Sequence, residues 1–199
     1  MKNRNKRGII PLLLGVVLLL CAGFLTAYNI WDDHRAQTAV GQILENMVLP
    51  TQAEETEALP LYLQYPNMDM PVQNIDGNYY IGVLELPTLG LQLPVLSELT
   101  DYNLTISPCR YAGSAYLNNL IIGAHNYTSH FSHLRDLSYG DPIYFTDTDG
   151  NRFTYTVTEI ELLSPTAVEE MKSGNWPLTL FTCTVGGASR VTVRCETAA

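Results

Sequence analysis

The chain has 199 residues, of which 46% are hydrophobic and 10% aromatic, and its net charge is −9. This length and composition predict one folded domain with an appendage and exclude an intrinsically disordered chain. Beyond residue 27 lie all 20 acidic residues but only seven of the 11 basic ones. Little positive charge remains to neutralise phosphates, so no nucleic-acid partner is expected.

The N-terminal segment has the pattern of a membrane anchor. A basic cluster within residues 1–7 precedes residues 8–30, which carry no charge. About 20 apolar residues in a helix span a bilayer core of about 30 Å. Because basic flanks stay in the cytoplasm, we expect a cytoplasmic tail at 1–7, a single transmembrane helix at 8–30 and an extracellular remainder. The alternative is a cleaved signal peptide, but the apolar stretch is long for one and lacks a clear cleavage site.

Residues 31–70 are expected to connect this anchor to the next domain. Apolar residues between Val40 and Val48 recur with helical spacing, which predicts a juxtamembrane amphipathic helix that ends at Pro50. The following stretch, 51–60, is acidic and lacks apolar periodicity, which is typical of a linker.

Residues 71–199 have the pattern of a mainly β domain. Short runs rich in β-branched and aromatic residues alternate with turn signals. Hairpin turns are expected at 86–90 and 147–151, and short helical pieces at 128–137 and 166–173. Strands are expected at 80–86, 89–95, 120–125, 143–146, 153–162, 178–184 and 189–196. About seven strands without long helices between them predict a closed barrel or a sandwich.

A cysteine lies near the end of the strand expected at 178–184. Side chains alternate between the faces of a strand, so Cys183 shares a face with Thr179 and Phe181. Arg190 follows across a Gly-Gly turn, which can place its guanidinium beside the thiol on an antiparallel neighbour. Only a thiolate is a strong nucleophile, and a nearby arginine favours that form while offering donors to an oxyanion.

Thiol chemistry on an amide also needs a group that protonates the leaving amine, usually a histidine. His125 ends the apolar run 121–125 at an expected strand terminus, whereas His34 lies beside the expected membrane segment. His130 and His133 follow in a polar stretch. A metal site built from His125, His130 and His133 would lack an acidic partner at a convincing spacing, so no metal site is predicted.

Three further residues have less reactive interpretations. Cys195 falls on the same face as two valines of its strand, which indicates a small core residue. A Cys109–Cys195 disulfide is left open, because its geometry is not readable from sequence. Arg194 shares a face with Arg190 and is interpreted as a solvated strand residue. Arg190 is preferred as the site residue because it lies nearer the turn.

The segment TLFTC at residues 179–183 resembles the T-L-x-T-C signature of the sortase family. As in that family, a short loop and then an arginine, here Arg190, follow it. The run IIGAH at 121–125 resembles the sortase strand that ends in the active-site histidine. Two other segments, 80–95 and 130–145, resemble the family's early hairpin and the segment after the histidine. The resemblance implies a closed sortase-type barrel of about eight strands with short helices over residues 71–199.

The resemblance also implies a cysteine transpeptidase with named roles for four residues. Cys183 would attack the Thr–Gly amide of an LPxTG-like sorting signal and form a thioacyl intermediate. His125 would protonate the departing amine and deprotonate the incoming one. Arg190 would bind the oxyanion, and Thr182 would contact the substrate. The partners implied are proteins with a C-terminal sorting signal and an amine acceptor on a cell-wall precursor or a pilin lysine.

No cofactor is required by this chemistry, and calcium assistance, which some sortases use, is left open. Residues 147–151 begin like a calcium loop but lack a glutamate at its twelfth position, which favours a hairpin turn. The expected location is the cell membrane of a Gram-positive bacterium, with the catalytic domain outside.

Two alternatives compete with this interpretation. One is another thiol-dependent cell-wall transpeptidase or hydrolase, although no Ser-His-Gly-x-x-Asn-like run of L,D-transpeptidases is present. The other is a catalytically inactive, membrane-anchored binding module. No long insertion separates His125 from Cys183, which argues against the sortase class with a large helix there. An anchoring enzyme of the housekeeping or D/E-like classes is preferred.

Overall fold

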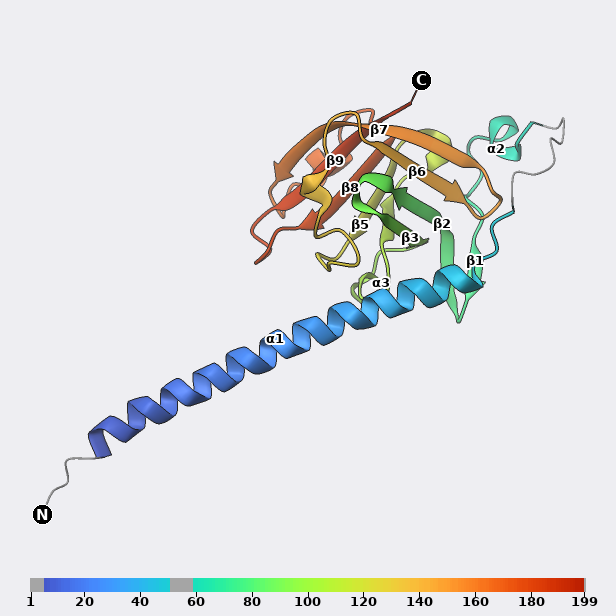
Figure 1. Ribbon diagram of the computed structural model, residues 1–199. Helices are drawn as coiled ribbons and strands as arrows, with labels where there is room; N and C mark the ends of the chain where they lie inside the picture. The colour runs from blue at the N-terminus through green and yellow to red at the C-terminus, as the bar shows by residue number, and fades with distance from the viewer. Residues whose placement is uncertain (1–5, 51–58, 199) are drawn as a thin grey trace, which may run out of the picture. The chain divides into compact units, whose positions relative to one another are not determined.

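The computed structural model describes residues 6–50 and 59–198 of the protein (Figure 1). The chain divides into two compact units between Arg35 and Ala36. Most of the predicted acidic linker falls on residues 51–58 and lies outside the described residues.

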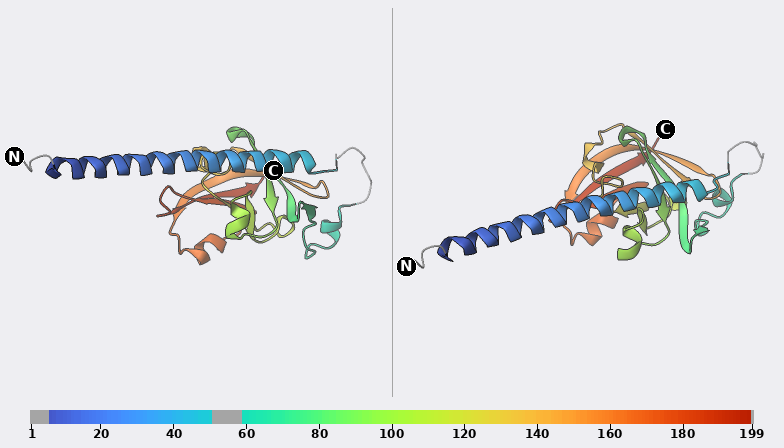
Figure 2. Two further views of the ribbon diagram at one scale, coloured as in Figure 1. Left: turned by 90° about the horizontal axis from the view of Figure 1, so that it is seen from below. Right: turned by 60° about the horizontal axis from the view of Figure 1, so that its bottom comes forward.

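One long helix, α1 (Lys6–Asn46), runs across the unit boundary without a break (Figure 2). In the first unit its large apolar side chains, from Ile9 to Trp31, are exposed. A helix that is apolar on all sides suits a lipid environment. Within the described residues, α1 is the one helix whose length and apolar composition would allow it to cross a membrane. The helix predicted from the spacing of residues 40–48 is present as the last turns of α1, which end at Asn46.

The second unit is a closed β-barrel (Figure 1). Its strands are β1 (Gln73–Ile75), β2 (Asn78–Leu86), β3 (Leu91–Leu96), β4 (Cys109–Ala112), β5 (Leu120–Ala124), β6 (Pro142–Asp147), β7 (Arg152–Leu163), β8 (Leu178–Cys183) and β9 (Arg190–Thr197). Their order is β1-β2-β3-β4-β5-β8-β9-β7-β6, and β6 pairs back onto β2. Strands β2 to β9 therefore form the closed eight-stranded ring that the sortase resemblance implies, and β1 is an addition to β2.

The barrel closes at a glycine. Gly82 on β2 is opposite Val95 of β3 and Asp147 of β6, so two strands flank it at the seam. Its φ is +152°, and a Cβ at this position would lie 2.1 Å from the carbonyl oxygen of Thr146. Because only glycine avoids this clash, residue 82 permits the close backbone approach that joins β2 to β6.

All seven predicted strands are present, and both predicted hairpins are confirmed as β2–β3 and β6–β7. The structure adds β1 and β4, which are short, and β4 pairs with β3 through the single pair Leu96–Cys109. Runs this short carry little periodicity. The helix predicted at 166–173 is α4 (Val168–Lys172). The piece predicted at 128–137 is reduced to turns and one 3-10 turn, η3 (Leu134–Asp136), because its Ser, Thr and Asp residues favour turns.

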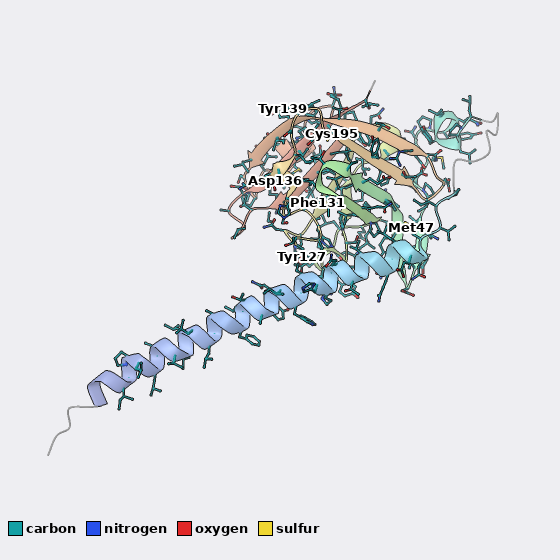
Figure 3. All side chains as sticks on the ribbon, viewed as in Figure 1. Met47, Tyr127, Phe131, Asp136, Tyr139 and Cys195 are labelled. Carbon is teal, nitrogen blue, oxygen red and sulfur yellow. The ribbon has the colours of Figure 1, made fainter. Side chains whose placement is uncertain are left out.

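The remaining elements are short. They are α2 (Leu61–Gln64), α3 (Asp101–Leu104), η1 (Pro87–Leu89) and η2 (Ala115–Leu117). The main core fills the barrel with buried residues of β2, β3 and β5 to β9, and Phe131 enters it from the segment after β5 (Figure 3). Within the second unit, Val40 of α1 joins this core and Ile43 joins a smaller cluster with Cys109. The end of α1 is thus part of the folded domain rather than a free stalk.

Candidate active site

Cys183 and Arg190 lie side by side at one rim of the barrel. They are the last residue of β8 and the first of β9, and they are direct partners in the antiparallel register. Nη1 of Arg190 donates a hydrogen bond of 2.9 Å to Sγ of Cys183. The expected proximity of thiol and guanidinium is therefore confirmed.

The loop between these two residues is tied at its base. The backbone N–H of Thr184 donates to the Ser189 carbonyl at 2.8 Å, and the Ser189 N–H donates to the Thr184 hydroxyl at 3.0 Å. Gly186 and Gly187 have φ of +81° and +71°, a conformation that favours glycine. A short, closed loop of this kind holds the ends of β8 and β9 in register.

His125 reaches the same rim through a strand far away in sequence. Strand β5 pairs in parallel with β8, and the last pair is Ala124 with Thr182. One step further along this register, His125 is level with Cys183. His125 and Cys183 line the same groove, and the imidazole contacts the ring of Tyr127 at a centroid distance of 5.2 Å. The structure thus brings together three of the four predicted site residues.

Thr182, the fourth, has a different position. Its side chain is buried, and its hydroxyl donates to the carbonyl oxygen of Ala124 at 2.9 Å. This bond ties β8 to β5 directly before Cys183 and His125. Thr182 is not among the residues that line the groove, so a contact with substrate stays a prediction.

The groove next to Cys183 has a volume of about 310 Å³. Its walls are mostly apolar and come from the β3–β4 connection, β4, β5 with the residue after it, β8, the start of β9 and the β7–β8 connection with α4. The lining residues are Leu99, Asp101, Leu104, Tyr111, Ala124, His125, Pro165, Ala167, Val168, Met171, Phe181, Cys183 and Arg190. An apolar cleft with a few convergent polar groups is the usual form of a small-molecule or peptide site.

A glycine shapes this groove. A Cβ on Gly123 would lie 2.5 Å from Cζ of Phe181, so only glycine at 123 lets the phenylalanine ring pack over β5. The ring is also 5.4 Å from that of Tyr111, edge to face. The Gly of the run IIGAH therefore allows the aromatic wall that faces the reactive groups.

The interpretation of Arg194 as a solvated residue is wrong. Its side chain is 2% exposed, and it forms an ion pair of 2.9 Å with Glu161. The guanidinium also donates to the hydroxyl of Thr179 and to the backbone carbonyls of Glu170 and Met171. Arg194 does face away from the barrel core, as alternation predicts, but α4 covers it. Sequence alternation identifies the face of a strand and not what packs on it.

His130, His133 and Asp147 do not line the groove and have other contacts. His130 is buried against the ring of Tyr127, and His133 pairs with Asp136 at 2.9 Å. Asp147 accepts hydrogen bonds from the backbone of its own turn and from the Tyr116 hydroxyl, which confirms the hairpin interpretation of residues 147–151. In the part of the chain that the structure describes, no group of three His, Cys, Asp or Glu side chains is arranged to hold a metal ion.

The four cysteines are free, so the Cys109–Cys195 disulfide is absent. Cys195, labelled in Figure 3, is buried in the main core, as predicted. Cys109 belongs to the smaller cluster. Burial raises the pKa of both thiols to about 12. Cys183 is the one half-exposed thiol in the second unit.

Within the second unit, thiol labelling is therefore expected to be selective. Cys21 in the first unit is a free, exposed thiol, and its labelling does not bear on this expectation. Iodoacetamide at pH 8 should modify Cys183 in the native protein, while Cys109 and Cys195 stay unmodified because both are buried and protonated at that pH. Peptide mapping by mass spectrometry after a brief reaction in detergent checks this. Labelling of Cys109 or Cys195 at the rate of Cys183 would contradict the buried positions, and labelling in denaturant provides the control for complete reaction.

Comparisons with known proteins give a consistent result. The family model described as the sortase domain matches residues 84–198. Sortase A of Bacillus anthracis is 28% identical over 197 residues, which cover 90% of this chain and 89% of that protein. The structure of sortase E from Streptomyces avermitilis is similar with a TM-score of 0.51 and 26% identity, and the match covers 60% of this chain and 88% of that one. Sortase A from Corynebacterium diphtheriae has the same fold, with a TM-score of 0.55, 20% identity, and coverage of 87% and 85%.

Proposed function

The chain belongs to the sortase family, and from this premise we propose that it cleaves an LPxTG-like sorting signal and transfers the acyl group to an amine. The observation that carries the proposal is the 2.9 Å hydrogen bond from Arg190 to the Cys183 sulfur, in a groove that His125 also lines. A nucleophile, an acid–base group and a cationic donor are the three parts that amide acyl transfer through a thioester needs.

The proposed reaction has two halves. The Cys183 thiolate attacks the carbonyl carbon of the Thr–Gly bond, and the Arg190 guanidinium stabilises the oxyanion. The C–N bond then breaks, the leaving amine takes a proton from the His125 imidazolium, and a thioester remains on Cys183. An incoming amine attacks this thioester, its proton passes to His125, and the sulfur departs as a thiolate. Protons and charge balance over the cycle, and no cofactor takes part.

The groove supports the assignment of the donor substrate. Leu104, Val168 and Met171 offer apolar surface to the leucine and proline of such a signal, and Phe181 extends it toward Cys183. Burial of apolar side chains in a preformed groove gives binding energy without charged contacts. The polar atoms of Arg190 and His125 are left for the scissile amide.

The proposed location follows from α1. Residues 8–30 would anchor the protein in the cell membrane, with residues 1–7 in the cytoplasm, and residues 31–70 would connect the anchor to the catalytic domain at 71–199. The length and apolar composition of α1 and the basic N-terminal residues support this arrangement. The active site would then be accessible to secreted proteins and to cell-wall precursors or pilins, outside the membrane of a Gram-positive bacterium.

The decisive experiment is the intact mass of the full chain in detergent after incubation with a panel of LPxTG-like peptides. We expect an adduct equal to the peptide up to its threonine acyl group, located on Cys183 by tandem mass spectrometry. The matched control is the same protein with Cys183 alkylated beforehand, which should gain no peptide. If native protein alkylates readily but forms no adduct with any peptide of the panel, the proposal is wrong and an inactive binding module is favoured.

A further inference from the structure

A second pocket of about 240 Å³ also contacts Cys183. Its other lining residues are Asn126, Ser132, Arg135, Thr184, Val185 and Val191, and it shares only Cys183 with the apolar groove. The thiol therefore lies where two separate cavities meet. An acyl group held on this sulfur would have the apolar groove on one side and this second pocket on the other.

The second pocket contains the cation of Arg135, which forms no ion pair with any described residue. The second unit has six Lys and Arg residues, and five have a partner: the Ser97 carbonyl for Arg110, Glu85 for Arg152, the Tyr111 ring for Lys172, Cys183 for Arg190 and Glu161 for Arg194. Within the residues that the structure describes, Arg135 has no such partner, and its side chain is exposed. Its neighbour Asp136 is already paired with His133.

The other lining residues of the second pocket add no negative charge. The polar ones are Asn126, Ser132 and Thr184, and no carboxylate is among them. The Ser132 Oγ is buried without a hydrogen-bond partner among the described residues, so it lies behind the surface of the pocket. A pocket with one guanidinium and no carboxylate suits an anionic ligand.

We propose that the second pocket binds the acceptor and that Arg135 selects an amine accompanied by a carboxylate. The inference rests on the proposed transpeptidation. A guanidinium binds a carboxylate through two parallel hydrogen bonds, and in a protein with a net charge of −9 an anionic acceptor needs such a local cation. The amine nitrogen forms the new C–N bond, the C–S bond breaks and His125 receives the proton. The carboxylate stays paired with Arg135 and does not react.

This chemistry distinguishes between the two acceptor classes. The side-chain amine of a lysine within a pilin has no free carboxylate nearby. An amino-acid-like amine on a cell-wall precursor, with a free carboxylate close to its nitrogen, can place that carboxylate on Arg135 while its nitrogen reaches the thioester on Cys183. The substrate class is therefore a carboxylate-bearing amine rather than a protein lysine.

The test measures how the acyl-enzyme partitions between aminolysis and hydrolysis. The full chain in detergent is given an LPxTG-like peptide that acylates it, with glycylglycine or its C-terminal amide as acceptor, and the products are quantified by mass spectrometry. We expect glycylglycine to be used about five- to tenfold better than the amide, the range of a charge-assisted hydrogen bond that is partly exposed. Arg135→Gln should remove this preference without changing the amount of acyl-enzyme, and Arg135→Glu should reverse it.

The matched control is Arg152→Gln, which removes an exposed arginine outside both pockets and should keep the preference. A parent protein that uses both acceptors equally would overturn the proposal, as would a preference that survives in Arg135→Gln. A parent that forms no acyl-enzyme would overturn the proposed function itself, and the two failures are separated because acylation is measured before any acceptor is added.

Discussion

Replacing Arg190 with glutamine is expected to lower the rate constant for acylation of Cys183 by about 100- to 1,000-fold, the usual cost of losing an oxyanion donor. Arg190 is the direct neighbour of Cys183 in the register and donates to its sulfur. Glutamine keeps hydrogen-bonding groups but loses the positive charge that would stabilise the oxyanion. The acylation rate constant of Arg190→Lys should lie between those of the parent and of Arg190→Gln, because an ammonium keeps the charge but lacks the fixed set of donors of a guanidinium.

Single-turnover acylation with a saturating peptide, followed by intact mass, measures this effect. Arg152→Gln is again the control, since it removes an exposed guanidinium far from the groove, and its acylation rate should match the parent. Thermal unfolding of each variant shows whether the barrel is intact. Full-rate acylation by a folded Arg190→Gln protein would mean that the oxyanion is stabilised elsewhere.

Replacing Arg194 with methionine is expected to lower the free energy of unfolding by about 1.5–3 kcal/mol, the range for losing the hydrogen bonds of a charged group, because the Glu161 left behind is partly exposed to water. The arginine is 2% exposed and neutralises Glu161 while it caps the carbonyls of Glu170 and Met171. Those carbonyls lie at the end of α4, and Met171 lines the substrate groove. In the folded fraction of Arg194→Met, the KM for the sorting peptide should therefore rise by a larger factor than the factor by which kcat falls.

Chemical denaturation and steady-state kinetics of the same preparation check both parts. Thr192→Val is the matched control on β9, because the Thr192 hydroxyl is buried without a hydrogen-bond partner among the described residues. Its replacement by a methyl group should leave stability unchanged or raise it by about 1 kcal/mol. An Arg194→Met protein as stable as the parent would show that α4 does not depend on this guanidinium.

Much of the barrel was predictable because strand signals are local. Alternating apolar residues and turn residues located seven strands and two hairpins, and they placed Cys195 in the core. The proximity of Cys183 and Arg190 was predictable for the same reason, since a short Gly-Gly turn joins the ends of two antiparallel strands. The short strands β1 and β4 were missed because three or four residues show no clear period.

The sequence by itself therefore determined the β class, the proximity of Cys183 and Arg190, and the apolar N-terminal helix. Only the tertiary structure decided that His125 is level with Cys183, because this depends on the parallel pairing of β5 with β8 across a long connection. It also decided that Arg194 is buried under α4 and that Arg135 lies in a pocket beside the thiol. The physical reason is the same in each case: alternation reports the face of a strand, whereas its neighbours are set by contacts between distant segments.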